Sequence, residues 1–160
     1  MNINSLFNKQ NLLDEHIIKE RDLHGQDLLN YKLTALSVEL GELWNEHPTL
    51  FKFWSDKENN REKGLIEFVD CIHFAISIAN DFDYHEHTYI KTTPRDLNMM
   101  YLGLQNNIAI LSISKEQRHV ETLLNNLISL GHQLGFKEED VLTAYNDKNK
   151  VNYERQENGY

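Results

Sequence analysis

Two pairs of acidic residues lie in otherwise apolar stretches of this sequence. Glu39 and Glu42 belong to LTALSVELGELWNEH, and Glu67 and Asp70 belong to LIEFVDCIHF. Each pair has an i, i+3 spacing, which places both carboxylates on one face of a helix, about 60° apart. Because a buried charge without a partner is costly, either these faces are solvated or a cation binds to them.

A shared metal ion would account for the repetition of the acidic pair. If the two helices pack antiparallel, four carboxylates can converge, and hard divalent cations with oxygen ligands relieve the repulsion between them. Few imidazoles accompany the acids, which favours Mg²⁺ or Mn²⁺ over zinc. A di-iron site requires the ExxH spacing on two helices, and only Asp70 and His73 have a comparable spacing. A single acidic pair is more often a solvated helix face.

The last segment of the chain offers cations that suit an anionic ligand. Lys148, Asn152 and Arg155 follow one another at i, i+4 and i+7 in YNDKNKVNYERQENGY, so on a helix they share one face. Lysine and arginine bind phosphate oxygens, and arginine can form paired hydrogen bonds to them. A basic stripe is commonly only a solvated surface. Together with the acidic pairs, however, this one suggests a polyphosphate held between a metal and these cations.

The elements that must position these side chains are expected to be helices. Apolar residues recur at spacings of three and four, and only 2 prolines and 7 glycines punctuate the chain. Thr93 with Pro94 predicts the start of a fourth helix, and Ser114 with Gln117 the start of a fifth. The predicted helices cover residues 4–23, 26–46, 61–81, 93 onward, 114–135 and 137–156. The sequence therefore predicts an all-α fold with one domain over residues 1–160, an antiparallel helical bundle that a partner chain could complete.

Composition argues against several classes of protein. The chain has 16 Lys+Arg against 25 Asp+Glu and a net charge of -9, whereas a nucleic-acid-binding surface needs a basic footprint. Cys71 is the only cysteine, so neither a disulfide framework nor a Cys-based zinc site is expected. No apolar run approaches the roughly 18 to 20 residues of a membrane span, and the N-terminus lacks a signal-peptide pattern. We therefore expect a cytoplasmic protein that binds neither nucleic acids nor membranes.

Four segments carry a resemblance to a known family: KLTALSVELGELWNE, FKFW, EFVDCIHF and YNDKNKVNYERQENGY. In order and spacing they resemble the dimeric all-α dUTPases of phages and bacteria, which are related to the MazG-like nucleoside triphosphate pyrophosphohydrolases. The resemblance implies Mg²⁺-dependent hydrolysis of dUTP to dUMP and pyrophosphate, with water attacking the β-phosphorus, which limits uracil incorporation into DNA. Two or more ions per site are implied, with Mn²⁺ as a substitute. Val38 departs from the EExxE pattern of the wider superfamily, which leaves the number of ions open.

The resemblance also implies roles for individual residues. Glu39 would orient or deprotonate the attacking water. The implied metal ligands are Glu39, Glu42, Glu67 and Asp70; the implied phosphate-binding residues are Lys148, Asn152, Arg155 and Lys52; the implied base- or sugar-binding residues are Gln10, Asp14, Phe53, Trp54, His73 and Phe74. Plainer interpretations compete for some of these: a core histidine for His73, core aromatics for Phe53 and Trp54, and a solvated lysine for Lys52.

Partners follow from the same resemblance. It implies a homodimer that takes dUTP as substrate, with dUDP as a second candidate. Phage-borne members of the family bind repressor proteins, so a repressor is a further candidate partner. Two other functions stay open at this level: a MazG-like hydrolase of another nucleotide such as dCTP, and a non-catalytic helical dimeric regulatory module.

Overall fold

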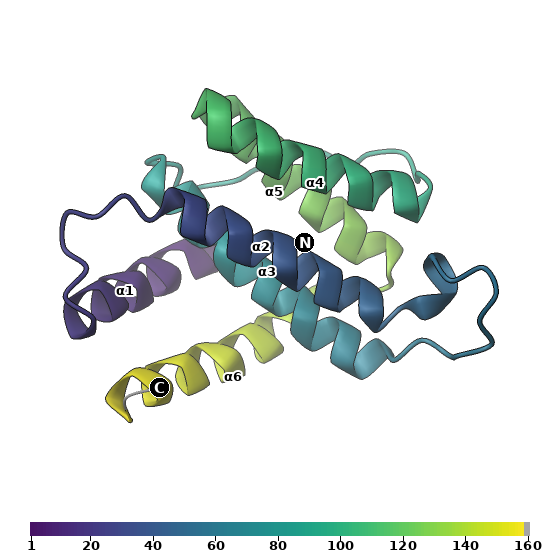
Figure 1. Ribbon diagram of the computed structural model, residues 1–160, viewed down its shortest axis with the longest axis horizontal. Helices are drawn as coiled ribbons and strands as arrows, with labels where there is room; N and C mark the ends of the chain where they lie inside the picture. The colour runs from purple at the N-terminus through teal and green to yellow at the C-terminus, as the bar shows by residue number, and fades with distance from the viewer. Residues whose placement is uncertain (159–160) are drawn as a thin grey trace.

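The computed structural model describes residues 1–158 of the protein. Within these residues six α-helices are connected by loops, and a short 3₁₀ helix follows the second of them (Figure 1). The elements are α1 (Asn4–Glu20), α2 (Leu29–Asn45), η1 (Pro48–Leu50), α3 (Arg61–Asp81), α4 (Leu97–Ser114), α5 (Gln117–Gln133) and α6 (Glu138–Glu157). The predicted all-α fold is therefore confirmed.

Helix α3 forms the centre of the structure. It packs against α1, α2, α5 and α6, and every residue from Phe68 to Ala79 is buried except Phe74. A helix that is surrounded by others needs apolar residues on all its faces, and the stretch FVDCIHFAISIA largely meets this demand. Its polar members, Asp70, His73 and Ser77, are the residues that need an explanation.

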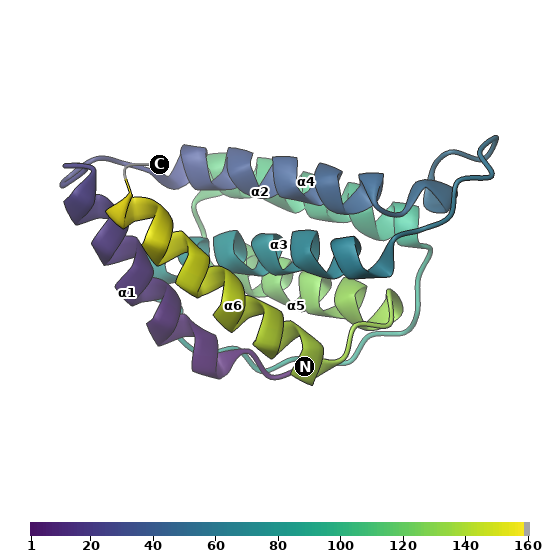
Figure 2. The ribbon, with the colours of Figure 1, turned by 90° about the horizontal axis from the view of Figure 1, so that it is seen from below.

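The six described helices lie in three levels, with α3 in the middle one. Figure 2 shows α2 and α4 above, α3 and α5 in the middle, and α1 and α6 below. α2 and α3 form an antiparallel hairpin joined by the loop over residues 46–60 (Figure 1). The fully buried side chains between these levels include Leu36, Leu40 and Leu43 of α2, Phe68 and Ile72 of α3, and Leu124 and Leu127 of α5.

The start of α4 differs from the prediction. Thr93 and Pro94 precede the helix, which begins at Leu97 and has Asp96 as its N-cap, with the Asp96 side chain accepting a hydrogen bond from the N–H of Met99. The side chain of Gln133 hydrogen-bonds both the N–H and the C=O of Arg95. These bonds compete with helix formation before Asp96, so the predicted N-cap at Thr93 is wrong.

The start of α5 was also predicted wrongly. Ser114 is the last residue of α4, and α5 begins only at Gln117, after Glu116. Lys115 between them has a φ of 49°, in the left-handed region. A left-handed residue commonly ends a helix, and here it prevents Ser114 from acting as the N-cap of the next one.

The loop between α1 and α2 is longer than predicted, because α1 ends at Glu20 and α2 begins at Leu29. Asp22 and Gly25 have φ values of 52° and 75°, which a right-handed helix cannot accommodate. The predicted bounds of α3 are confirmed, and those of α6 are correct to one residue. None of the helices between residues 1 and 158 combines the length and apolarity that crossing a membrane would require.

Gly131 allows α5 to approach α3 closely, since a methyl group at this position would collide with the buried ring of Phe68. We expect Gly131→Ala to lower the free energy of unfolding by about 1 to 3 kcal/mol, because a tightly packed ring must move. Urea denaturation measures this difference. Thr122→Ala, on the exposed side of the same helix, is the control and should change stability by at most about 0.5 kcal/mol. Wild-type stability of Gly131→Ala would contradict the close approach.

Candidate active site

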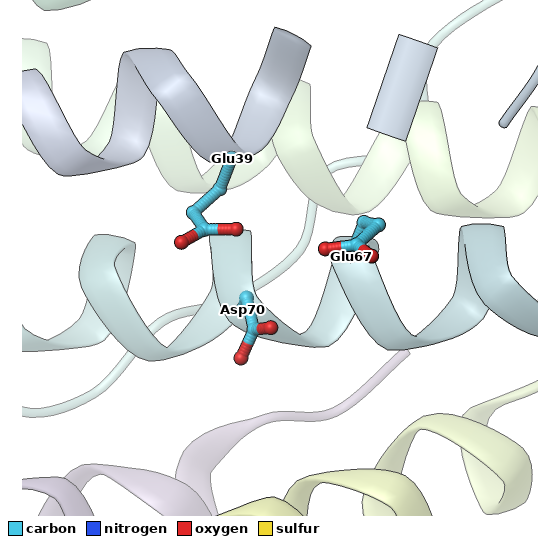
Figure 3. Close-up of side chains that lie close together, drawn as sticks. All are labelled: Glu39, Glu67 and Asp70. Carbon is cyan, nitrogen blue, oxygen red and sulfur yellow. The ribbon is translucent and has the colours of Figure 1, made fainter. Parts of the chain in front are cut away.

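Three of the four predicted acids meet across the contact between α2 and α3. Glu39 points from α2 toward α3, which carries Glu67 and Asp70 one turn apart (Figure 3). One carboxylate oxygen from each lies within 4.8 Å of the others. Leu36 and Leu40 beside Glu39 are fully buried against the core, so the glutamate lies at the edge of an apolar helix contact. The i, i+3 spacing on α3 thus places Glu67 and Asp70 on the same face of the helix, as helix geometry predicts.

The electrostatics of this acidic cluster, Glu39, Glu67 and Asp70, are unfavourable without a cation. Burial raises the pKa of Glu39 to about 7, and the charges of Asp70, Glu42 and Glu67 add to the rise. Burial and the charge of Asp70 also raise the pKa of Glu67. For Asp70, burial raises the pKa against the opposing effect of Lys148, whose Nζ lies 2.6 Å from Asp70 Oδ2. Three partly desolvated carboxylates therefore share one ammonium group.

The donor set of the acidic cluster fits a hard divalent cation. Three carboxylate oxygens in close reach are ligands that Mg²⁺ or Mn²⁺ prefers, and neither imidazole nor thiolate belongs to the cluster. A bound cation would reverse the effect that raises these pKa values, because it favours the charged carboxylates. Glu42 is exposed and lies outside the cluster, although its charge is close enough to raise the pKa values of Glu39 and Glu67.

A cavity of about 630 Å³ leads from the acidic cluster to the base-binding candidates, and α1, α2, α3 and α6 all contribute to its wall. This volume is typical of a small-molecule site. The predicted residues that line it are Gln10, Asp14, Glu39, Asp70, His73, Phe74, Lys148, Asn152 and Arg155. Nine residues predicted for three different roles therefore share one cavity.

The far end of this cavity is a hydrogen-bond network. Gln10 Nε2 donates to Asp14 Oδ1 at 2.8 Å, and His73 Nδ1 lies 2.7 Å from Gln10 Oε1. Burial lowers the pKa of His73 to about 3, so its imidazole is neutral, and burial raises the pKa of Asp14 against the opposing charge of Lys32. His73 is thus both a buried, hydrogen-bonded histidine and a residue of the cavity wall.

The basic residues lie on the α6 side of the cavity. Lys148, Asn152 and Arg155 all line it, as their shared helix face predicts. Lys148 is paired with Asp70, and the charge of Arg155 is close enough to lower the pKa of the same carboxyl group. Cations and acids therefore meet at one end of the cavity.

Three further predicted residues lie together in a loop away from the cavity. Lys52, Phe53 and Trp54 belong to the loop between η1 and α3 and do not line the cavity. Phe53 is 93% exposed and Trp54 70% exposed, and their rings contact each other edge to face. The alternative that these two aromatics are core residues is therefore wrong.

Ser77 and Lys32 are among the residues of the cavity wall that were not predicted from the sequence. Ser77 Oγ donates to Asp14 Oδ2 at 2.6 Å, and Lys32 Nζ lies 3.8 Å from the same oxygen. Their spacing was a usable signal, because Ser77 follows Asp70 by seven residues and Lys32 precedes Glu39 by seven. Residues seven apart lie on the same side of a helix.

Comparison with known families agrees with this geometry. A family model described as dUTPase matches residues 2–160, nearly the whole chain. The chain belongs to this dUTPase family. Membership assigns it dUTP diphosphatase activity, and enzymes of this kind generally depend on a divalent metal. A search of curated proteins finds no match.

The raised pKa of Glu39 predicts that, without divalent metal, the stability of this dUTPase depends on pH. The group titrates near 4.5 when unfolded and near 7 when folded. Below the lower value both states are protonated. As the pH rises toward the higher value the unfolded state loses its proton first, so the contribution of Glu39 to stability falls, while the lowered pKa of His73 acts in the opposite direction below about pH 6.5. Because Glu39 is partly exposed, solvent screening limits the expected loss to the order of 1 kcal/mol.

Urea denaturation in EDTA across this pH range measures the loss. The stability of the wild type relative to Glu39→Gln should fall as the pH rises from about 4.5 to about 7, because an amide does not titrate, whereas Glu20→Gln at the exposed end of α1 should leave the profile unchanged. A Glu39→Gln profile identical to that of the wild type would contradict the assigned environment of Glu39.

Proposed function

We propose that the protein hydrolyses dUTP to dUMP and pyrophosphate with Mg²⁺, or Mn²⁺ in its place, and so limits uracil incorporation into DNA. The observation that supports this most directly is the one cavity that joins Glu39 and Asp70 to the pair Gln10 and Asp14. A nucleoside triphosphate needs both ends of such a cavity, since its phosphates require cations and its base requires directed hydrogen bonds. dUDP is a second candidate substrate.

Glu39 is our candidate to orient or deprotonate the attacking water. It lies on the cavity wall beside Asp70, and a carboxylate there can accept the proton as the water oxygen attacks. Attack at the β-phosphorus breaks its bond to the oxygen that bridges to the α-phosphorus. That oxygen leaves with dUMP, and the water oxygen remains in pyrophosphate. Held by Glu39, Glu67 and Asp70, with Glu42 as a further ligand, two or more Mg²⁺ ions would offset the triphosphate charge and lower the pKa of bound water.

The α6 residues would bind the phosphates. Lys148 and Arg155 would stabilise anionic oxygens of the triphosphate, and Asn152 would orient a phosphate or the sugar. Their place on the cavity wall supports these roles. Lys148, which pairs with Asp70, would then exchange part of this contact for phosphate.

The opposite end would select the base. Uracil presents a carbonyl acceptor next to a ring N–H donor, and Gln10 Nε2 with the Asp14 carboxylate offers the complementary donor and acceptor. His73 and Phe74 supply ring surface on the same wall. Phe53, Trp54 and Lys52 stay predictions, because their loop lies outside the cavity and would have to approach its mouth to touch a nucleotide.

The homodimer is part of this proposal, and an apolar groove between α2 and α4 supports it. Val38, Trp44, Phe51 and Leu102 line this groove of about 570 Å³, with Val38 52% and Leu102 59% exposed. Contiguous exposed apolar side chains mark interaction surfaces. A second copy of the chain, related by a two-fold axis, would present the same apolar surface and bury it. It would also exclude water from Glu42, which lies in the groove beside the acidic cluster.

The oligomeric state tests this surface. We expect wild-type protein to sediment as a dimer and Leu102→Glu to sediment as a monomer, because the new charge would lie within the apolar contact. Leu12→Glu is the matched control, since Leu12 is similarly exposed on α1, away from the groove. Analytical ultracentrifugation measures both. A monomeric wild type, or a dimer that persists in Leu102→Glu, would contradict the proposed interface.

Pyrophosphate release from a panel of deoxynucleoside triphosphates tests the function. With Mg²⁺ we expect kcat/KM for dUTP to exceed that for dCTP by at least about tenfold, since a mismatched base leaves buried polar groups unpaired. EDTA should abolish turnover. Glu39→Gln should lower kcat by about 10² to 10⁴, the usual contribution of a positioned base, while Glu20→Gln retains wild-type turnover.

Each outcome of this assay separates the candidate functions. Preference for another base would favour a MazG-like hydrolase of that nucleotide. Absence of turnover with every nucleotide would favour a non-catalytic dimeric module. Full activity of Glu39→Gln would remove Glu39 from water activation.

A further inference from the structure

Tyr145 of α6 is fully buried and lies directly behind the proposed base-selecting end of the cavity. Its hydroxyl donates to Gln10 Oε1 at 2.6 Å. Its ring stacks on His73, with the ring centroids 3.8 Å apart and the planes inclined by 13°. His73 Nδ1 approaches the same Gln10 oxygen at 2.7 Å. The side chains of Tyr145 and His73, which stack on each other, thus both hydrogen-bond Gln10 Oε1.

The chemistry of the neighbours fixes which way the Gln10 amide faces. Asp14 is 2.8 Å from the other end of the amide, and an ionised carboxylate can only accept hydrogen bonds, so the nitrogen must face it. Burial raises the pKa of Asp14, but the hydrogen bond from Ser77 Oγ and the nearby Lys32 oppose this rise because both favour the ionised carboxylate. The oxygen must then face Tyr145 and His73, which requires the neutral imidazole of His73 to carry its hydrogen on Nδ1.

We propose that Tyr145 is a positioning residue for base selection, which acts by holding the Gln10 amide with its N–H directed at the base. This inference rests on the proposed function, in which the base lies against Gln10 and Asp14. One Nε2 hydrogen of Gln10 goes to Asp14, and the second is left for a carbonyl of uracil. Cytosine presents an amino group and a bare ring nitrogen at the same places, so donor would face donor and acceptor would face acceptor.

Tyr145→Phe removes only the hydroxyl and keeps the ring that stacks on His73. Gln10 Oε1 retains its His73 donor, so no buried acceptor is left unpaired and the fold should persist. Losing one of the bonds that orient the amide should raise KM for dUTP roughly 3- to 10-fold, the effect of one hydrogen bond, with kcat within about twofold. The ratio of kcat/KM for dUTP over dCTP should fall by a similar factor. When the Gln10 amide flips, its oxygen faces the base and can accept a hydrogen bond from the cytosine amino group.

A control and a double-mutant cycle separate positioning from a general structural effect. Tyr89→Phe removes another tyrosine hydroxyl, near Ser129 and outside the cavity wall, and should leave the ratio unchanged. In a Gln10→Ala background, Tyr145→Phe should have no further effect on the ratio, because Tyr145 acts through the missing amide. Thermal denaturation of each variant checks the fold.

The results have distinct meanings. Wild-type turnover of dUTP tests the proposed function, and its failure would be seen before any variant is compared. An unchanged dUTP-to-dCTP ratio in Tyr145→Phe, or an equal loss of the ratio in the Gln10→Ala background, would overturn the positioning role while leaving the proposed function intact.

Discussion

The packing of α2 against α3 holds three carboxylates within reach of one another against their mutual repulsion. Burial and the neighbouring charges raise the pKa values of Glu39 and Glu67, so the metal-free arrangement is unfavourable by itself. Apolar burial along the same two helices offsets this cost, because fully buried side chains such as Leu36, Leu40 and Ile72 accompany the acids. The apolar core therefore stabilises the packing of α2 against α3, which the repulsion between the three carboxylates opposes.

The central helix α3 sets the geometry of the cavity. Asp70, His73 and Ser77 follow one another at i, i+3 and i+7, so they share one side and span about 10 Å of helix axis. The first pairs with the cation of α6, and the other two hydrogen-bond with side chains of α1. A single buried helix thereby fixes the separation between the acidic cluster and the pair Gln10 and Asp14.

The spacing of residues along the sequence predicted which site residues share one face of a single helix. The acids of α3 and the stripe of α6 lie as their periodicity requires, because helix geometry is local. The N-cap at Thr93 could not be excluded in this way, since contacts of Gln133, distant in sequence, decide the conformation before α4. The N-cap at Ser114 failed for another reason, the left-handed backbone of Lys115. Phe53 shows another limit: hydrophobicity predicts that a ring is buried, yet this ring is 93% exposed.

A net-acidic chain that binds a polyanion needs its cations at the phosphates, and α6 brings Lys148 and Arg155 to the acids instead of to open solvent. Lys148 hydrogen-bonds Asp70 and opposes the burial that raises the pKa of this carboxyl. A phosphate that draws Lys148 away leaves Asp70 buried without that compensation, unless a second cation replaces it. In the proposed function, phosphate binding and metal binding would therefore be linked through Asp70, because each would change the charge around this carboxylate.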